Sequence, residues 1–194
     1  MIKVTVKLEG VSPISYSRYV EQSQNDHESK EDCDKRHWIE KAHWNKEGQA
    51  FIPPISLTRA LAATAKYLGK TIPGKGKATW TKHFEAGVMV LEAPLLPYWR
   101  KDVEKSPEIY REVILANADG VRGSGKRVNR YFPTFPSWET SATFYVVDPA
   151  ITEESFREHL EAAGQFNGLG RFRPRNGGFY GRFRVVDMKW KNEK

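Results

Sequence analysis

An alternating pattern at the start of the chain places the strongest constraint on how this sequence can fold. In the stretch "IKVTVKLEG", Ile2, Val4, Val6 and Leu8 are separated by polar or charged residues. Side chains in a strand point alternately to its two faces, so a period of two predicts a strand with one buried face. We therefore expect a half-buried strand over residues 2–10.

Two later stretches carry helical signals. The first begins near Ser56, a good N-cap residue, repeats apolar residues at helical spacing and ends at Gly69. The second begins at Thr152, which is followed by two acids in the first turn, and is expected to end at Gly164. Each is long enough to cover part of a sheet.

Three further stretches are rich in β-branched and aromatic residues and predict strands at about 84–93, 141–148 and 179–190. The resulting order is β-α-β-β-α-β, the split βαβ pattern of ferredoxin-like and RNA-recognition (RRM-like) folds. We predict an α+β fold, with an antiparallel sheet that both helices cover on one face. Its other face stays open, where related domains stack unpaired bases on aromatic rings.

The predicted fold accounts for only part of the chain. Residues 11–52 and 94–140 form two large insertions, and connections of that length in compact domains usually carry small elements and function. A chain of 194 residues suits one domain with a real core. We therefore predict a single domain over residues 1–194, with no internal repeat and no linker.

Composition excludes several classes of protein. No apolar run approaches the roughly 18–20 residues that span a bilayer, and the first ten residues lack the unbroken apolar stretch of a secretion signal. The one cysteine, Cys33, rules out an internal disulfide. Its spacing to His37 and His43 matches no zinc signature. We expect a cytoplasmic protein without a membrane partner, metal or cofactor.

Positive charge is segregated along the chain, whose net charge is +7. Three runs, residues 70–83, 120–131 and 166–184, hold 13 basic residues and no acid. Such segregation is typical of a face that binds a polyanion, although three unrelated solvated loops would give the same pattern. We expect folding to bring the three runs together into one continuous trough.

The third run contains "NGLGRFRPRNGGFYGRF", in which glycines, arginines and aromatic residues alternate without an acid. Its glycines would let backbone amides converge on phosphate oxygens. Arginine offers forked donors for phosphate, and aromatic rings offer faces for bases. Phe183 we assign to the core of the last strand. The predicted nucleic-acid contacts in this run are Arg171, Arg173, Arg175, Tyr180 and Arg182.

The other two runs combine basic residues with flexible glycines and a neighbouring aromatic ring, which suits a groove that follows a nucleic-acid backbone. Neither matches the spacing of a phosphate-binding P-loop. A short "YSRY" stretch adds a further ring and a cation. The predicted contacts here are Lys75, Lys77, Trp80, Lys82, Arg122, Lys126, Arg127, Arg130, Tyr16 and Arg18.

Catalysis has weaker support in the sequence. His83, at the end of a basic loop, is the only histidine that we would test as a general acid or base. His37 and His43 lie six residues apart, which does not place them on one helix face. We therefore lean towards a protein that is not an enzyme.

Three motifs resemble those of the RAMP superfamily, the Cas5, Cas6 and Cas7 proteins of CRISPR systems. The stretch "FIPPISLTRALAATAKYLG" looks like the motif that opens the first RAMP helix, and "EGVSPISYSRY" is similar to the turn after the first strand. The glycine-rich run resembles the loop that precedes the last RAMP strand. The chain departs from the family pattern at Pro54, where glycine is usual. The resemblance implies a nucleic-acid-binding protein of a bacterium or a phage-infected cell, and extends to short phage-borne proteins.

From residues and resemblance together, we predict a sequence-tolerant binder of single-stranded RNA or DNA that is able to oligomerise along the strand. Two alternatives stay open. One is a metal-independent RNA endonuclease of the Cas6 type. The other is a component or inhibitor of a CRISPR-type complex that acts through protein contacts, for which the acid-rich segment 21–47 would be a protein-facing appendage.

Overall fold

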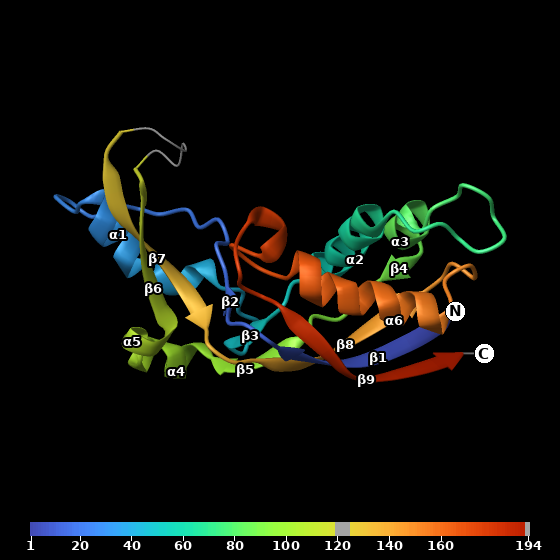
Figure 1. Ribbon diagram of the computed structural model, residues 1–194. Helices are drawn as coiled ribbons and strands as arrows, with labels where there is room; N and C mark the ends of the chain where they lie inside the picture. The colour runs from blue at the N-terminus through green and yellow to red at the C-terminus, as the bar shows by residue number, and fades with distance from the viewer. Residues whose placement is uncertain (119–124, 193–194) are drawn as a thin grey trace.

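A four-stranded antiparallel sheet forms the base of the structure, a computed structural model that describes residues 1–118 and 125–192 (Figure 1). The strand order is β4-β8-β1-β9, with bounds Val88–Met89, Glu139–Val146, Ile2–Gly10 and Phe183–Asn192. All neighbouring strands run antiparallel. The alternation in β1 buries Val4, Val6 and Leu8 completely, as the sequence predicts.

Two helices, α2 (Pro54–Leu68) and α6 (Glu153–Ala162), lie on one face of this sheet (Figure 1). The hydroxyl of Thr152 caps α6 as predicted, and Gly69 ends α2 in the left-handed conformation with φ 59°. The prediction that Ser56 caps α2 is wrong. The helix begins at Pro54, whose fixed φ suits the first helical turn and whose missing N–H costs nothing there.

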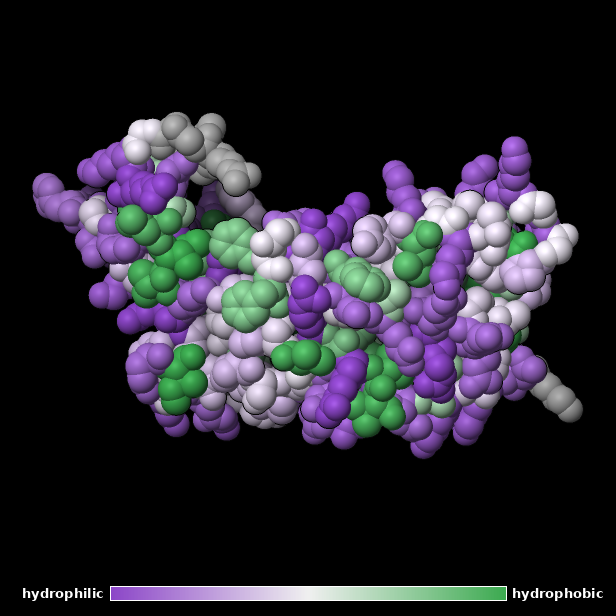
Figure 2. Space-filling view, in the orientation of Figure 1, coloured by the Kyte–Doolittle hydropathy of each residue, from purple (hydrophilic) through white to green (hydrophobic). Residues whose placement is uncertain are grey.

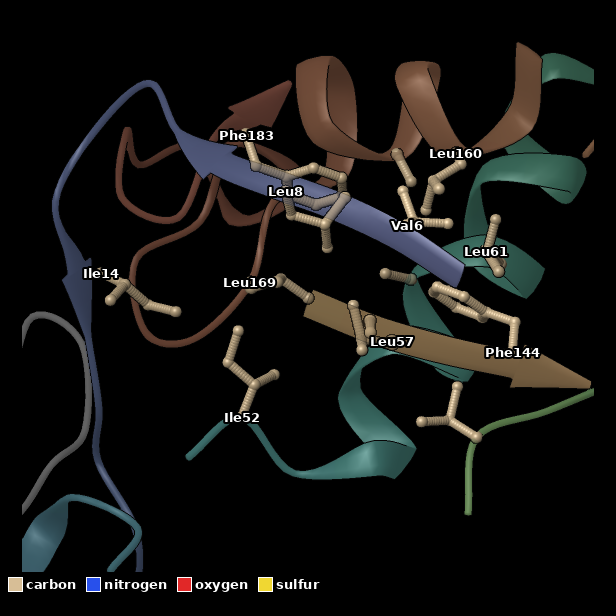
Figure 3. Close-up of a cluster of buried hydrophobic side chains, with 14 of the residues drawn as sticks. Val6, Leu8, Ile14, Ile52, Leu57, Leu61, Phe144, Leu160, Leu169 and Phe183 are labelled. Carbon is tan, nitrogen blue, oxygen red and sulfur yellow. The ribbon is translucent and has the colours of Figure 1, made fainter. Parts of the chain in front are cut away.

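Apolar side chains from the sheet and the two helices meet in one core. Figure 3 shows Val6, Leu8 and Phe144 from the sheet facing Leu57, Leu61 and Leu160 from the helices. Leu169, from the glycine-rich segment before β9, points into the same core and is fully buried (Figure 3). One side chain thus anchors the glycine-rich segment to the body of the protein.

The two predicted insertions do carry small elements of their own. The first holds β2 (Ile14–Ser15), α1 (Lys30–Arg36), a 3-10 turn η1 (Trp38–Lys41) and β3 (Gln49–Phe51). The second holds β5 (Leu95–Trp99), α4 (Arg100–Lys105), α5 (Pro107–Tyr110), β6 (Arg111–Asn117) and β7 (Arg127–Phe135). They pair with each other, in the strand orders β2-β7-β6 and β3-β5. The insertions therefore build one lobe, from which β6 and β7 extend as an arm (Figure 1).

A buried ion pair holds the acid-rich segment against this arm. The Nζ of Lys41 lies 2.7 Å from the carboxylate of Asp34 and donates a second hydrogen bond to the carbonyl of Tyr131 at 2.8 Å. The amide of Tyr131 donates to Asp34 in turn. These bonds give Asp34 a structural role inside the protein.

The predicted strand at 84–93 is wrong for most of its length. Residues 81–86 form a helix, α3 (Thr81–Ala86), and only Val88 and Met89 pair with β8. The ring of Phe84 stacks on His159 of α6, with ring centroids 4.3 Å apart. Packing on a helix thus decides the conformation of a segment whose composition favours a strand.

Two boundaries near the last strand also differ from the prediction. Gly164 does not end α6, because the chain continues in a π-helical turn, η2 (Ala163–Asn167). A side chain at position 164 would overlap the carbonyl oxygen of Phe183, so glycine serves close packing here. The last strand, β9, begins at Phe183 instead of near residue 179, and a shift of register between Lys7 and Leu8 of the neighbouring strand accompanies the inward position of Met188.

The architecture is a mixed α/β arrangement with antiparallel sheets, as the order of sequence patterns predicts. Across residues 1–118 and 125–192, no helix has the length and apolar character needed to cross a membrane.

Candidate nucleic-acid interface

The glycine-rich segment between α6 and β9 lies along α2 (Figure 1). It contains η2 and a 3-10 turn, η3 (Pro174–Asn176). The side-chain amide of Asn167 donates to the carbonyl of Ala60 on α2 at 2.9 Å, and the amide of Leu169 donates to the carbonyl of Gly181 at 3.0 Å. These bonds hold the segment in a defined conformation beside the helix.

A pocket of about 530 Å³ opens between this segment and the C-terminal half of α2. Tyr67 from α2 and Phe166 from η2 lie on its wall with ring centroids 5.7 Å apart and planes tilted by 38°. Tyr67 is 70% exposed and Phe166 is 43% exposed, so both rings offer accessible surface. We call this site the aromatic pocket; Ala63, Thr64, Lys66, Gln165, Asn167, Pro174, Arg175 and Arg182 complete its lining.

The aromatic pocket is positively charged. Three of its lining residues, Lys66, Arg175 and Arg182, are cations, and none is an acid. Arg182 donates to the carbonyl oxygen of Gln165, a neutral group that leaves the positive charge uncompensated. Flat rings are able to stack on bases, and guanidinium and ammonium groups are able to pair with phosphates.

Arg171, a predicted phosphate contact, is instead part of the core. It is only 9% exposed and pairs with Glu112 of β6, while its guanidinium lies 3.9 Å from the ring centroid of Phe132. Burial lowers the pKa of Arg171, although Glu112 opposes that shift. The prediction of an accessible guanidinium at this position is wrong, because the arm supplies an internal partner that lies far away in sequence.

Tyr180 shares the same carboxylate. Its hydroxyl donates to Glu112, and burial together with this bond raises the pKa of Tyr180 to about 12. Tyr180 is 9% exposed, so its ring is not available to a base. With Arg171 it fastens the glycine-rich segment to the arm.

Two other rings predicted as contacts are also buried. Trp80 packs edge-on against Phe84 with ring centroids 6.1 Å apart, and Tyr16 packs edge-on against Phe135 at the same distance. Tryptophan and tyrosine bury large apolar areas, and here that burial stabilises the fold. The stacking role predicted for these rings is not available to them.

The backbone amides of the glycine-rich segment are mostly engaged within the protein, contrary to the prediction that they converge on phosphate. Arg171 donates its amide to the carbonyl of Ser15 at 2.7 Å, and Gly181 donates to that of Pro13 at 2.7 Å. Further internal donors are the amides of Gly168, Leu169, Asn176, Gly177, Gly178 and Tyr180. The glycines therefore permit close packing more than anion binding.

The three basic runs do not meet in one trough. Residues 70–83 lie at the end of the molecule beside α3, the arm lies at the opposite end, and the glycine-rich segment lies between them (Figure 1). Lys75, Lys77 and Lys82 are exposed at the first end, and Lys126 and Arg127 are exposed at the second. The predicted continuous trough is wrong, and the central segment remains as a separate site.

The remaining residues of the arm differ in their surroundings. Arg130 donates to the carbonyl of Ala118 at 2.9 Å and lies 3.4 Å from Asp34, so part of its charge is compensated. Arg122 lies outside the described residues. Within residues 126–131, the arm thus offers two exposed cations, Lys126 and Arg127, beside Arg130, which is already engaged.

His83, the residue considered for catalysis, forms a pair with Asp148. Its Nδ1 lies 2.6 Å from the carboxylate, and both side chains are about one-quarter exposed. The amide of Ala150 holds the pKa of Asp148 below its usual range, and His83 adds to that effect. Among the residues that the structure describes, no cluster of His, Cys, Asp and Glu could hold a metal ion.

Sequence reasoning missed Tyr67, Phe166 and Lys66. A signal was present for Tyr67, because it stands beside Lys66 in a helix whose buried face is set by Leu57, Leu61 and Ala65. A large ring outside that face is available to a ligand. Phe166 gave no such signal, because its exposure depends on the π-helical turn that extends α6.

The accessible apolar side chains on one side of the molecule form separate patches. Figure 2 shows them interrupted by hydrophilic residues over the whole of this face.

The chain matches no protein-family profile and no characterised protein sequence. A chain in the cryo-EM structure of the type III-B Cmr-beta bound to cognate target RNA matches 97% of it with a TM-score of 0.58 and 10% identity. The present chain spans 60% of the length of that chain. The crystal structure of Cmr6 from Pyrococcus furiosus matches 96% of the chain, and 99% of Cmr6, with 11% identity and a TM-score of 0.46. The first likeness shows that the two chains share a fold.

Proposed function

We propose that the protein binds single-stranded nucleic acid at the aromatic pocket. One observation carries this proposal: two exposed rings and three cations, with no acid in the described lining, line a single groove between α2 and the glycine-rich segment. Each ring face can stack a base, with a contribution of roughly 1–3 kcal/mol per base. The cations would hold the phosphates that flank it.

The proposed recognition tolerates different sequences. Every base has a flat face, so stacking on Tyr67 or Phe166 does not depend on base identity. The lining offers three cations for the backbone and two side-chain amides that could read a base edge, but that of Asn167 is buried and donates to Ala60, so only Gln165 of this lining has an exposed amide. A duplex keeps its bases stacked and unavailable, so we expect a preference for single strands.

The fold supports this proposal and defines it further. We propose that residues 1–194 form one domain of ferredoxin-like topology, since β1, α2, β4, β8, α6 and β9 follow one another in the chain and the sheet order is β4-β8-β1-β9. The chain of similar fold belongs to a complex bound to target RNA, which favours RNA over DNA as the ligand. We propose further that the protein acts within a CRISPR-type complex or as copies arranged along one strand.

The remaining predicted contacts extend the surface. Lys75, Lys77 and Lys82 would attract the strand at one end of the molecule, and Lys126 and Arg127 at the other. Trp80 and Tyr180 are not part of the proposed contacts because they are buried, and the buried ring of Tyr16 is not available to stack a base. Arg171 is paired internally with Glu112.

A fluorescence polarisation titration tests the proposal. Labelled single-stranded RNA, single-stranded DNA and duplex of equal length are titrated at about 50 and 200 mM salt, where phosphate contacts make affinity salt-dependent. We expect tight, salt-sensitive binding of RNA and weak binding of duplex. Equal affinity for duplex and single strands would reject the pocket as a base-stacking site.

The His83–Asp148 pair favours a second candidate function, metal-independent RNA cleavage. A carboxylate that orients a histidine is a recurring part of acid–base catalysis, and these two side chains are partly accessible. A gel of RNA incubated with the protein in EDTA tests this candidate. Cleavage that a His83→Ala variant abolishes would establish it, and intact RNA would dismiss it.

A further inference from the structure

A second, smaller pocket lies at the N-terminal end of α2, separate from the aromatic pocket. Its volume of about 170 Å³ leaves room for several water molecules and so for a tetrahedral anion. We call it the α2 N-terminal pocket. The lining residues used below are Tyr16, Arg18, His43, Ser56, Arg171 and Arg173.

The lining of this pocket is strongly cationic. Three guanidinium groups contribute to it, and only that of Arg171 forms an ion pair within the described part of the chain, with Glu112. Burial lowers the pKa of Arg173, and its neighbours Arg175 and Arg59 lower it further. Arg18 and Arg173 thus have no ion-pair partner among the described residues, and a bound anion would relieve the repulsion on Arg173.

Three residues that line this pocket each carry a buried polar atom with no hydrogen-bond partner among residues 1–118 and 125–192: the hydroxyl of Tyr16, Nη1 of Arg171 and Nε of Arg173. Tyr16 is 4% exposed, and burial raises its pKa, so the phenol stays protonated. Both guanidinium nitrogens are donors only. Three unmet donors around one pocket indicate that an acceptor belongs there.

The end of α2 adds a further attraction for negative charge. This helix of 15 residues has no acid in its first turn and no side-chain cap, so the positive end of its dipole is not neutralised from within the helix. Ser56, which does not cap the helix, lies in this first turn and lines the pocket. His43 completes the wall, and burial together with Arg18 lowers its pKa, which keeps the imidazole neutral.

We propose that the α2 N-terminal pocket is a phosphate-binding site, with the hydroxyl of Tyr16 and the guanidinium groups of Arg18 and Arg173 as its main donors. Each non-bridging oxygen of a phosphate accepts more than one hydrogen bond, so one phosphate group can serve three separate donors. The identification of this phosphate as part of a nucleic-acid strand rests on the proposed function.

The position of the pocket suits a strand that also reaches the aromatic pocket. Ser56 and Lys66 lie ten residues apart on α2, which is about 15 Å along the helix axis at 1.5 Å per residue. The glycine-rich segment supplies Arg173 to one pocket and Arg175 to the other. A strand lying along α2 would thus place a phosphate at one end and a base at the other.

Inorganic phosphate is the first probe. Thermal unfolding and amide chemical shifts are followed while phosphate replaces chloride at constant ionic strength. We expect phosphate, and not chloride, to raise the unfolding temperature of the wild-type protein and to shift the amides of residues 16–18 and 170–173. Equal effects of the two anions would overturn the proposal.

Tyr16→Phe is the sharpest variant, because it removes a hydroxyl that has no partner in the described structure and leaves the packed ring in place. We expect phosphate affinity to fall about tenfold, as for loss of a hydrogen bond to a charged group, with no change in the unfolding temperature without phosphate. Tyr19→Phe, which alters an exposed tyrosine outside the pocket, is the matched control. Unchanged phosphate affinity in Tyr16→Phe would overturn the proposal.

Arginine variants give a second, independent test. Arg18→Gln and Arg173→Gln should each weaken phosphate binding, whereas Arg184→Gln, on the exposed end of β9 beside Glu9, should not. An equal loss in all three would indicate a general charge effect and would overturn the proposal.

Oligonucleotides then separate a phosphate within a strand from a free phosphate. An RNA with neutral methylphosphonate linkages is compared with the normal phosphodiester in wild-type and Tyr16→Phe proteins. If the neutral linkages weaken binding to the wild-type protein, and Tyr16→Phe does not weaken the binding of the neutral RNA any further, the result supports a strand phosphate in the pocket. If the protein binds phosphate, loses that binding in Tyr16→Phe and does not bind RNA, the phosphate site stands and the proposed function is rejected. If the protein binds RNA but responds neither to phosphate nor to Tyr16→Phe, the proposed function stands and the phosphate site is rejected.

Discussion

The salt dependence of RNA binding is the most direct measure of the aromatic pocket. Lys66, Arg175 and Arg182 line it without an acid, so each is available to a phosphate. A phosphate contact on a single strand contributes a slope of about −0.7 to the plot of log K against log salt. Removing all three charges should therefore flatten the slope by about two units.

This change is large enough to measure at two salt concentrations. For a fourfold rise in salt, a slope of −2.1 corresponds to a loss of affinity of about 18-fold, which the wild-type protein should show and the variant should not. The variant carries Lys66→Gln, Arg175→Gln and Arg182→Gln, since glutamine keeps much of the length and the polar end of each side chain. Polarisation titrations with labelled RNA between about 50 and 200 mM salt give both slopes.

A control must separate the pocket from the net charge of the protein. Lys101, Lys189 and Lys191 are exposed, and none of them lines the pocket. Their triple replacement by glutamine removes the same net charge and should leave the slope within about half a unit of wild type. The reasoning is refuted if the pocket variant keeps the wild-type slope, or if both variants flatten it equally.

Three further outcomes are expected. Tyr67→Ala and Phe166→Ala each remove a stacking face and should weaken RNA binding by about tenfold, measured by polarisation. Because both rings are exposed, the unfolding midpoints in thermal melts should stay near wild type. Arg171→Gln should lower the free energy of unfolding by about 3 kcal/mol, measured in urea, because it leaves Glu112 without its buried partner. Burial lowers the pKa of His159 in the folded protein. Below the unfolded pKa of about 6.5 the unfolded chain therefore binds a proton that the folded protein does not, and the free energy of unfolding should fall between about pH 7 and 5. In the His159→Phe variant, denaturant midpoints measured across this range should fall less.

The central fold could be predicted because local patterns and tertiary packing agree there. The alternation in β1 gives the only arrangement that buries Val4, Val6 and Leu8 together, and Thr152 begins α6 whatever the helix packs against. The strand predicted around Phe84 is wrong because local composition and tertiary packing disagree there. Its composition favours a strand, but the ring is buried against α6 when the segment is helical.

The lobe built by the insertions could not be predicted from local patterns. Its strands pair across long separations, as Ile14 of β2 does with Phe135 of β7. Its polar interior depends on Asp34 and Lys41, which look like ordinary solvated charges in the sequence. A charge seen in sequence has no known partner until the fold supplies one, and so the basic runs suggested more accessible positive charge than the structure offers.

The three arginines of the glycine-rich segment show how the fold divides a uniform pattern among different tasks. At spacings of two residues, an extended chain would point Arg171, Arg173 and Arg175 to the same side. Phe172 has a positive φ of 45° and Pro174 begins a 3-10 turn, so the direction changes at each step. Arg171 turns inward to Glu112, whereas the other two reach separate pockets at the two ends of α2.

This division explains why the internal arginine still matters for binding. Positive φ at a bulky residue is strained and persists only where surrounding contacts fix the backbone. The pairing of Arg171 and Tyr180 with Glu112 supplies such contacts on either side of Phe172 and η3. A segment held in this way loses little conformational entropy on binding, so its outward cations can act from preset positions. Variants of Glu112 should therefore weaken RNA binding as well as stability, although Glu112 lines neither pocket.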